Sequence, residues 1–258
     1  MRHQTLIGSS VLHMDDRFSL INSTSELPAG VSRELDDSGF VVIPGLVASE
    51  RLPHLADAYD FAVSGADSAD VSIGSTTTRV TDFVNRGSDF DDLYVCRPIL
   101  AACCRIIGGP FKLSTMHART VNPNSAEQAL HVDFRRDMDG WTMVGFIIMV
   151  DAFRSDNGST RFVPGSHKWS TIPGDTMKDP STDSSAEQLL ARGPAGSVII
   201  YNGSVWHGHS ANQTSEPRRS IQGAYIRRDA EPGLNLAARM CPETLGRIST
   251  LAKYLLAV

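Results

Sequence analysis

Two residue types that bind metal ions stand two positions apart in the segment Leu130-His131-Val132-Asp133. Alternate side chains of a strand point to the same face, so His131 and Asp133 can converge on one point. A neutral imidazole and a carboxylate are two of the three ligands in the facial triad that holds non-haem Fe(II). The same pair is also common in solvated turns, so it predicts a metal site only together with a third ligand.

A candidate for that third ligand lies in the segment Trp206-His207-Gly208-His209, which follows an apolar stretch at 197–201. A glycine beside a histidine allows a close approach of the backbone, which suits a ligand at a strand end. If the segment is extended, His207 and His209 point to the same side, so strand geometry alone does not choose between them. The alternative is a polar loop with two surface histidines.

An arginine completes the set of candidate residues. Arg218 opens the next expected strand and stands eleven residues after His207. The planar guanidinium can bind a carboxylate through two parallel hydrogen bonds. A single arginine at the start of a strand is usually a surface residue, so its significance depends on the combination with the histidines and the aspartate.

The elements that would position these residues fall into a helical first part and a strand-rich second part. The segment 39–45 predicts a short strand closed by a Pro-Gly turn. Helices are expected at about 49–63 and 90–107, with Pro98 kinking or splitting the second. After Pro110, short stretches rich in Val, Ile, Thr and Phe alternate with turn residues, which is typical of a sandwich or barrel. We therefore expect a mainly β fold with flanking helices, with strands at about 111–122, 130–134, 141–152, 160–163, 196–201 and 219–227.

The segments between these elements show weaker patterns. Residues 1–30 are polar and irregular, and we expect them to form an N-terminal extension. The polar segments 64–78 and 173–192 are expected to be loops, and they are candidates for lids over a substrate site. No linker interrupts the chain, so residues 1–258 are expected to form a single domain.

Composition and charge exclude several classes of function. The chain has 258 residues, 41% of them hydrophobic, and a net charge of −5, so no general basic surface is available for nucleic acid. The longest apolar run, 144–150, is too short to cross a bilayer, and the N-terminus lacks the pattern of a secretory signal. Four cysteines without a CxxC pair indicate free thiols. We expect a cytoplasmic protein that binds neither nucleic acid nor membrane.

The combination of HxD, a distal His-Gly and a later arginine resembles the Fe(II)/2-oxoglutarate-dependent oxygenases, and most closely the phytanoyl-CoA dioxygenase-like family. The sequence GFVVIPGLV at 39–47 resembles the N-terminal signature of that family. Residues 157–167 resemble its NG…PGSH segment, and His207-Gly208 with Asn212 resembles its HGxxxN motif. The resemblance covers about residues 34–228. It implies a double-stranded β-helix, a jelly roll of the cupin type, with helices packed on the larger sheet.

The resemblance also implies cofactors and residue roles. Fe(II), 2-oxoglutarate as cosubstrate and O2 would oxidise a C–H bond of a small organic substrate, with release of succinate and CO2. Halogenating relatives have glycine or alanine at the position of Asp133, so aspartate indicates hydroxylation, desaturation, ring formation or epimerisation. His209 departs from the family pattern, which often has a small hydroxyl residue there. The implied iron ligands are His131, Asp133 and His207; the implied cosubstrate residues are Arg218, with Ser220, His209 and Gln128 as weaker candidates.

Substrate contacts are the least defined part of the site. His117 and Arg119 share one face of the expected strand 111–122. The sequence fits a face that lines the cavity and a face that points outward equally well. Arg79 is a candidate for binding an anionic substrate, with surface solvation as the alternative. Ile147 lies on the expected inner face of the strand 141–152 and is a candidate contact. The identity of the substrate stays open.

Two other classes of function fit parts of the pattern. One is a catalytically silent jelly-roll protein that binds a metal or ligand without turnover. The other is a zinc hydrolase, because zinc also binds sites made of two histidines and a carboxylate. A hydrolase would have no role for Arg218, which favours the oxygenase.

Overall fold

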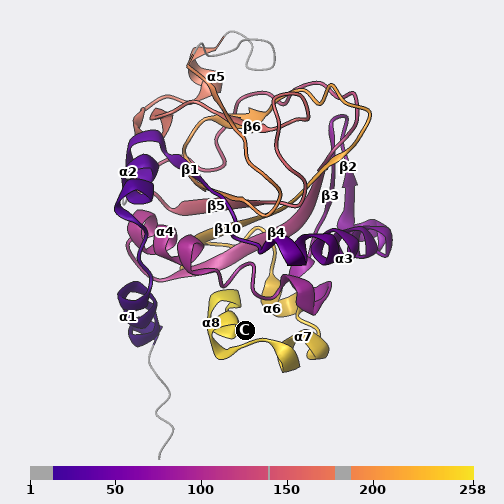
Figure 1. Cartoon of the computed structure of the whole chain (residues 1–258). Helices are drawn as coiled ribbons and strands as arrows, with labels where there is room; N and C mark the ends of the chain where they lie inside the picture. Colours follow the sequence, from indigo (N-terminus) through magenta and orange to yellow (C-terminus); the bar gives the residue numbers. More distant parts are fainter. Residues whose placement is uncertain (1–13, 139, 178–186) are drawn as a thin grey trace, which may run out of the picture.

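The computed structural model describes residues 14–138, 140–177 and 187–258. A seven-stranded antiparallel sheet, in the order β1-β8-β5-β10-β4-β3-β2, faces a three-stranded sheet in the order β7-β6-β9 (Figure 1). This arrangement confirms the expected mainly β fold. The strands are β1 (Phe40–Ile43), β2 (Val71–Ile73), β3 (Thr77–Val80), β4 (Phe111–Val121), β5 (Met143–Met149), β6 (Thr160–Phe162), β7 (Leu189–Ala191), β8 (Val198–Asn202), β9 (His207–His209) and β10 (Arg218–Arg227).

Strand β5 is buried on both faces, which explains its continuous apolar sequence. Phe146 packs in the cluster beneath the helices, whereas Ile147 and Met149 pack in the cluster between the two sheets. Phe40 of β1 stacks on Phe162 of β6 with ring centroids 4.3 Å apart, so aromatic contact joins the two sheets. The inner face expected for this strand is therefore confirmed.

Helices cover the outer face of the larger sheet (Figure 1). Helix α4 contacts β5 and β10, α8 packs on β4, and α2 lies beside β1. This covering leaves the inner face of the sheet to line a cavity. The helices are α1 (Met14–Thr24), α2 (Ala29–Ser38), α3 (Leu52–Ser64), α4 (Arg97–Ile107), α5 (Pro173–Thr176), α6 (Leu236–Arg239), α7 (Pro242–Arg247) and α8 (Thr250–Leu256).

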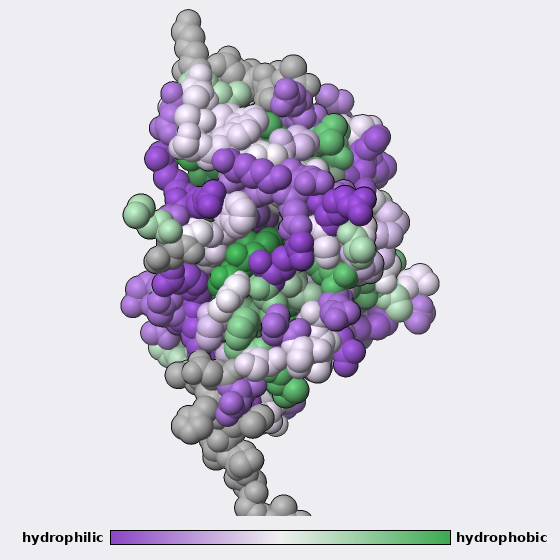
Figure 2. Space-filling view, turned by 90° about the vertical axis from the view of Figure 1, so that its left-hand side faces the viewer, coloured by the Kyte–Doolittle hydropathy of each residue, from purple (hydrophilic) through white to green (hydrophobic). Residues whose placement is uncertain are grey.

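Hydrophilic and hydrophobic residues are unevenly distributed over the outer surface of one side of the molecule, the side of α2 and α4 (Figure 2). The side that carries α2 and α4 is mostly hydrophilic, with a smaller hydrophobic area near its middle (Figure 2). Among the described residues, no helix has the length and apolar character needed to span a membrane. The four cysteines are all free thiols, as expected.

The helical part differs from the sequence-based expectation in two places. The described portion of residues 1–30 is not irregular, because it contains α1 and the start of α2, while residues 1–13 lie outside the described part. Ile21 and Leu35 are buried against the core, so tertiary packing stabilises helices that local sequence does not indicate. The helix expected at 90–107 begins only at Arg97. Pro98 occupies its first turn, where proline is favoured, and does not kink it.

Three expectations about the β part are also wrong. The segment 64–78 is not all loop: it contains β2 and the start of β3, because β3 pairs with β4 and extends the larger sheet. The strand expected at 130–134 is reduced to one isolated bridge between His131 and His207. The segment 173–192 is not all loop either, because it contains α5 and β7, and β7 forms by pairing with β6 in the smaller sheet. Its residues 178–186 lie outside the described part.

Candidate metal centre and cosubstrate pocket

His131, Asp133 and His207 form one cluster at the inner side of the smaller sheet. Their candidate ligand atoms all lie within 4.8 Å of one another. Nε2 of His131 is 3.8 Å from Oδ1 of Asp133, and Nε2 of His207 is 3.6 Å from Oδ2 of the same carboxylate. Two ring nitrogens and one carboxylate at this spacing can hold a divalent transition metal on one face.

Backbone pairing brings this cluster together from distant parts of the chain. The amide of His131 donates to the carbonyl of His207 at 2.9 Å, and the reverse bond has the same length. A Cβ on Gly208 would lie 2.9 Å from the carbonyl oxygen of Gln128 and 3.0 Å from that of Ala129. Glycine is therefore required there, because any side chain would push the two segments apart. This confirms that Gly208 allows a close approach of the backbone, and the backbone that approaches is the segment just before His131.

Each histidine ring is fixed by a hydrogen bond on its far side. Nδ1 of His131 donates to the carbonyl of Ala129 at 3.1 Å, and Nδ1 of His207 donates to the carbonyl of Val205 at 3.0 Å. These bonds set the tautomer that leaves both Nε2 atoms free for a metal. Burial, reinforced by the neighbouring His207, lowers the pKa of His131 to about 4, so this ring is neutral at pH 7 and available as a ligand. The donor set fits Fe(II).

Tyr201 is a site residue that the sequence did not indicate. Its hydroxyl donates to Oδ2 of Asp133 at 2.8 Å, and its ring lies 4.9 Å from that of His207. Burial alone would raise the pKa of Asp133. The neighbouring His207 and His131 and the hydrogen bond from Tyr201 outweigh this effect, so the pKa lies below its ordinary value. Gly145 makes room for the tyrosine, because a Cβ there would lie 2.1 Å from the ring. The carboxylate is therefore ionised and held in one orientation.

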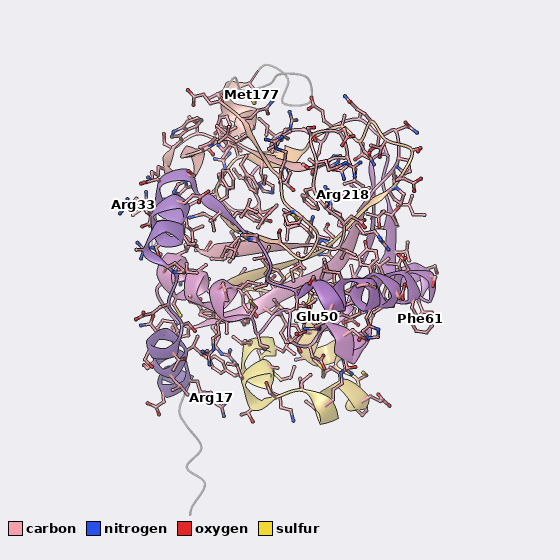
Figure 3. All side chains as sticks on the ribbon, in the orientation of Figure 1. Arg17, Arg33, Glu50, Phe61, Met177 and Arg218 are labelled. Carbon is pink, nitrogen blue, oxygen red and sulfur yellow. The ribbon has the colours of Figure 1, made fainter. Side chains whose placement is uncertain are left out.

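The cluster opens into a cavity of about 350 Å³ between the two sheets. Arg218 lies between the sheets, in contrast to Phe61 and Arg33 on the outside (Figure 3). The cavity is lined by polar and charged residues from β3, β4, β6, β9, β10 and the 128–133 segment, and by apolar residues from β5. They include Arg79, His117, Arg119, Gln128, His131, Asp133, Ile147, Thr160, Tyr201, His207, His209, Arg218 and Gln222.

Arg218 is almost completely buried, with 1% of its surface exposed. Its NH1 donates to the Ser220 hydroxyl at 3.0 Å, its NH2 donates to the Gly158 carbonyl at 2.7 Å, and its guanidinium lies 4.0 Å from the ring centroid of Phe153. Burial, reinforced by Arg119, lowers the pKa of Arg218 to about 9. A cation held this firmly without a carboxylate partner suits an anionic ligand.

The weaker cosubstrate candidates have other partners in the structure. Ser220 is fully buried behind Arg218 and does not line the cavity; it also donates to the Arg119 carbonyl. Nε2 of His209 lies 3.1 Å from the Thr76 hydroxyl, outside the metal cluster, although His209 lines the cavity. The amide oxygen of Gln128 accepts a bond from Arg119 at 2.7 Å.

All four candidates for substrate contact, Arg79, His117, Arg119 and Ile147, line the cavity. Sequence reasoning missed other parts of the wall, among them Gln222 and the segment 231–233. Gln222 follows from the alternation of β10, whereas the segment 231–233 lies in the C-terminal part and carried no signal. In contrast, the described residues of 64–78 and 173–192 are not among the lining residues, so the cavity wall gives no support to a lid role.

Two facing antiparallel sheets with a cluster of two histidines and a carboxylate between them define a double-stranded β-helix protein of the non-haem metal type. Residues 35–220 match the model of the phytanoyl-CoA dioxygenase (PhyH) family. The chain belongs to this family of Fe(II)- and 2-oxoglutarate-dependent oxygenases, which confirms the resemblance seen in the sequence.

Curated relatives and solved structures agree with this family. Dioxygenase cdmA from Talaromyces verruculosus is 36% identical over 109 residues, which cover 39% of this chain and only 35% of that protein. Dioxygenase af480 from Aspergillus fumigatus is 24% identical, over 100% of this chain and 90% of that protein. The crystal structure of HygX from Streptomyces hygroscopicus with nickel and 2-oxoglutarate bound has a TM-score of 0.66 at 17% identity, over 80% of this chain and 90% of that one. This likeness confirms the jelly-roll fold.

Proposed function

We propose that this chain hydroxylates, or otherwise oxidises, a C–H bond of a small organic substrate and releases succinate and CO2. His131, Asp133 and His207 hold Fe(II), and Arg218 binds the distal carboxylate of 2-oxoglutarate. The donor cluster carries the proposal. Its three groups are each oriented by a hydrogen bond of their own, and they converge in the same cavity that Arg218 lines.

The residues of the chain act by position. The ligand atoms of His131, Asp133 and His207 converge on one point and would hold the metal, with the cavity side left for cosubstrate and O2. When bound, iron with 2-oxoglutarate and O2 supplies the oxidising power for the attack on a C–H bond. The carbonyls of Ala129 and Val205 hold the two rings, Tyr201 holds the carboxylate, and Arg218 anchors the cosubstrate. Ile147 contributes an apolar wall that limits water near the site.

Two features narrow the reaction and the substrate. A carboxylate ligand at Asp133 occupies the position that a halide would need, which supports hydroxylation over halogenation; desaturation, cyclisation and epimerisation use the same oxidation. The cavity volume of about 350 Å³ suits a small molecule.

The test is turnover of 2-oxoglutarate without added substrate. With Fe(II), the protein is expected to consume O2 and to form succinate slowly, whereas His131→Ala, which removes a histidine ligand, forms none. A folded protein that binds Fe(II) and 2-oxoglutarate but forms no succinate would be a silent binding protein. Hydrolytic activity that depends on zinc, without Fe(II)-dependent O2 consumption, would make it a hydrolase.

Domain organisation and location complete the proposal. The C-terminal segment after the family match packs on β4 through α8 and contributes 231–233 to the cavity wall, which supports one oxygenase domain over the chain. Free thiols at all four cysteines support a reducing, cytoplasmic environment.

A further inference from the structure

The cavity holds more cationic side chains than the cosubstrate requires. Three arginines line it, Arg79, Arg119 and Arg218, against two carboxylates, Asp133 and Glu231. Among the described residues, none of the three arginines forms an ion pair with a carboxylate. If Arg218 takes the distal carboxylate of 2-oxoglutarate and the metal takes the other end, Arg119 and Arg79 have no anion to bind.

Arg119 is held in place but not neutralised. Its NH2 donates to the amide oxygen of Gln128 at 2.7 Å, and its NH1 donates to that of Gln222 at 3.5 Å. Its Nε is buried and has no partner. Burial, reinforced by Arg79, lowers the pKa of Arg119 to about 10, so the side chain stays charged at pH 7; Asp133 acts on it only at longer range, without an ion pair. A buried charge left in this state costs stability.

Arg79 adds to this cost. It lies directly opposite Arg119 across the antiparallel pair of β3 and β4. Like charges opposite each other on neighbouring strands destabilise a sheet. Arg79 is exposed, so it lies at the rim of the cavity, whereas Arg119 lies deeper. One anion between the two guanidinium groups would offset both costs.

His117 stands next to this pair, two residues before Arg119 on the inner face of β4. Burial, reinforced by Arg79 and Arg119, lowers the pKa of His117 to about 3, so this ring is neutral. It adds a hydrogen-bonding group to the cavity wall beside the arginine pair without adding charge. The wall made by β3 and β4 therefore has the chemistry to hold one polar, anionic end of a molecule.

We propose that Arg119, with Arg79 opposite it, binds a carboxylate of the organic substrate, so that the substrate is a small organic acid. This inference rests on the proposed function, since it assigns Arg218 to the cosubstrate. A carboxylate matches the planar guanidinium through two parallel hydrogen bonds. The acid end of the substrate lies against β3 and β4, and its remaining part extends toward His131 and His207.

The test compares matched acids and amides as probes. Hexanoate is paired with hexanamide, and N-acetyl-leucine with N-acetyl-leucinamide. Binding is measured without O2, to protein loaded with Fe(II) and 2-oxoglutarate, by ligand-observed NMR and by the shift of the visible charge-transfer band. The acids are expected to bind about ten- to a hundredfold more tightly than their amides, the range of a charge-assisted hydrogen bond.

Variants assign this preference to a residue. Arg119→Gln is expected to abolish the preference for acids and to leave the affinity for 2-oxoglutarate within about threefold, a difference of well under 1 kcal/mol. Arg119→Lys, which keeps the charge but loses the planar fork, is expected to keep part of the preference. The exposed Arg154→Gln is the control and is expected to change neither property.

Three results would overturn the inference. The first is a wild-type protein that binds acids no better than amides, including one that binds none of the probes. The second is a preference for acids that survives in a folded Arg119→Gln variant. The third is a loss of 2-oxoglutarate affinity of tenfold or more in Arg119→Gln, which would place Arg119 on the cosubstrate. Absence of the charge-transfer band in the wild type would instead contradict the proposed function itself.

Discussion

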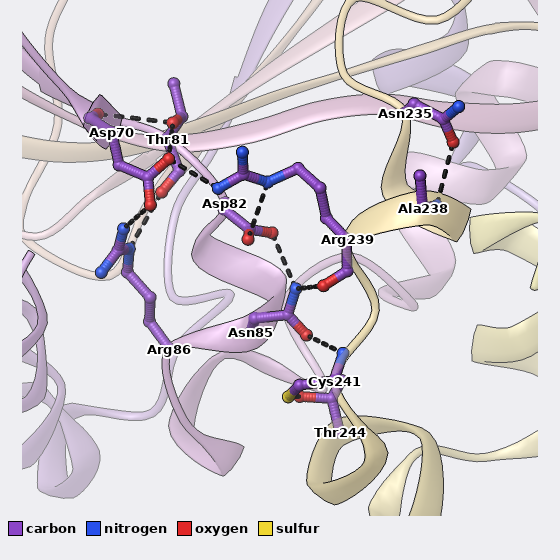
Figure 4. A network of polar contacts seen from close by, with 10 residues as sticks. All are labelled: Asp70, Thr81, Asp82, Asn85, Arg86, Asn235, Ala238, Arg239, Cys241 and Thr244. Carbon is purple, nitrogen blue, oxygen red and sulfur yellow. Dashed lines mark hydrogen bonds and ion pairs between the residues drawn. The ribbon is translucent and has the colours of Figure 1, made fainter. Parts of the chain in front are cut away.

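Arginines of this protein occur in two contrasting environments. On the outer side, Arg239 contacts Asp70 at 2.6 Å and Asp82 at 3.1 Å, and Arg86 contacts Asp70 at 2.7 Å (Figure 4). In the cavity, Arg218 and Arg119 have amide, carbonyl and hydroxyl partners but, within the described part of the chain, no carboxylate partner and no partner for the buried Nε of either.

This difference distinguishes arginines that stabilise the fold from arginines that can bind a ligand. The outer arginines are neutralised by the chain itself, and the ion pairs of Arg239 attach the C-terminal segment to Asp70, before β2, and to Asp82, after β3 (Figure 4). The inner arginines are oriented but not neutralised, so their charge is available to a ligand. Buried charges without counter-ions are costly and persist where binding requires them.

The largest expected effect lies at the metal end of the cavity. His207→Ala removes one of three ligands, so Fe(II) affinity should fall by more than about a hundredfold, because loss of a ligand's hydrogen-bond partner alone costs about ten- to a hundredfold. His209→Ala is the matched control: this ring contacts Thr76, and the variant should retain iron and most of the activity. Iron content after reconstitution, measured for both variants, decides which histidine is the ligand. Iron lost from the His209 variant but kept by the His207 variant would reverse the ligand assignment.

The comparison of arginines is tested by removing one of each kind. Arg218→Ala should weaken 2-oxoglutarate binding by about ten- to a hundredfold, since a charge-assisted pair is lost. Fe(II) binding should change little. Calorimetric titration of the iron-loaded protein with 2-oxoglutarate measures the first property, and iron content after reconstitution measures the second. Equal loss of iron would make Arg218 a structural residue, and an unchanged affinity for 2-oxoglutarate would assign the cosubstrate to another cation.

A smaller effect is expected at Tyr201. Tyr201→Phe keeps the ring but removes the hydrogen bond to Asp133, so Fe(II) affinity should fall by about tenfold, at the low end for a bond that orients a metal ligand. Competition with a chelator measures this affinity without turnover. An Fe(II) affinity equal to that of the wild type would show that Asp133 does not depend on the tyrosine for its orientation.

The smallest effect is expected for the outer arginine. Arg239→Ala should lower the free energy of unfolding by about 1 kcal/mol, because Asp70 keeps its ion pair with Arg86 and Asp82 keeps its hydrogen bond from Asn85. The affinity for 2-oxoglutarate should be unchanged. Denaturant unfolding and calorimetry check the two parts, and a marked loss of 2-oxoglutarate binding would remove the distinction between outer and inner arginines.

Much of the site could be predicted from the sequence, for an identifiable reason. The spacing in His131-Val132-Asp133, the glycine after His207 and the position of Arg218 are local features, and the structure places these residues around one cavity. The reasoning from an extended strand was wrong in detail, since His131 forms only an isolated bridge. Hydrogen bonds from both rings to carbonyl groups orient the cluster, although residues 130–134 form no strand.

The parts that sequence did not predict depend on long-range contacts. The bond between Tyr201 and Asp133, the pairing of Arg79 with Arg119 and the contribution of Glu231 to the cavity wall all join residues far apart in the chain. The strands within 64–78 are missed for the same reason, because β2 and β3 form by pairing with the sheet and not by local propensity.

The central claim is that the cluster of His131, Asp133 and His207 holds Fe(II) while Arg218 holds 2-oxoglutarate beside it. Anaerobic titration of the protein with Fe(II) and then 2-oxoglutarate, followed by visible absorption, tests this most directly. A weak charge-transfer band of a chelated keto acid should appear and saturate, and it should require higher 2-oxoglutarate in Arg218→Ala but not in Arg239→Ala. A folded, iron-loaded protein that develops no such band would contradict the claim.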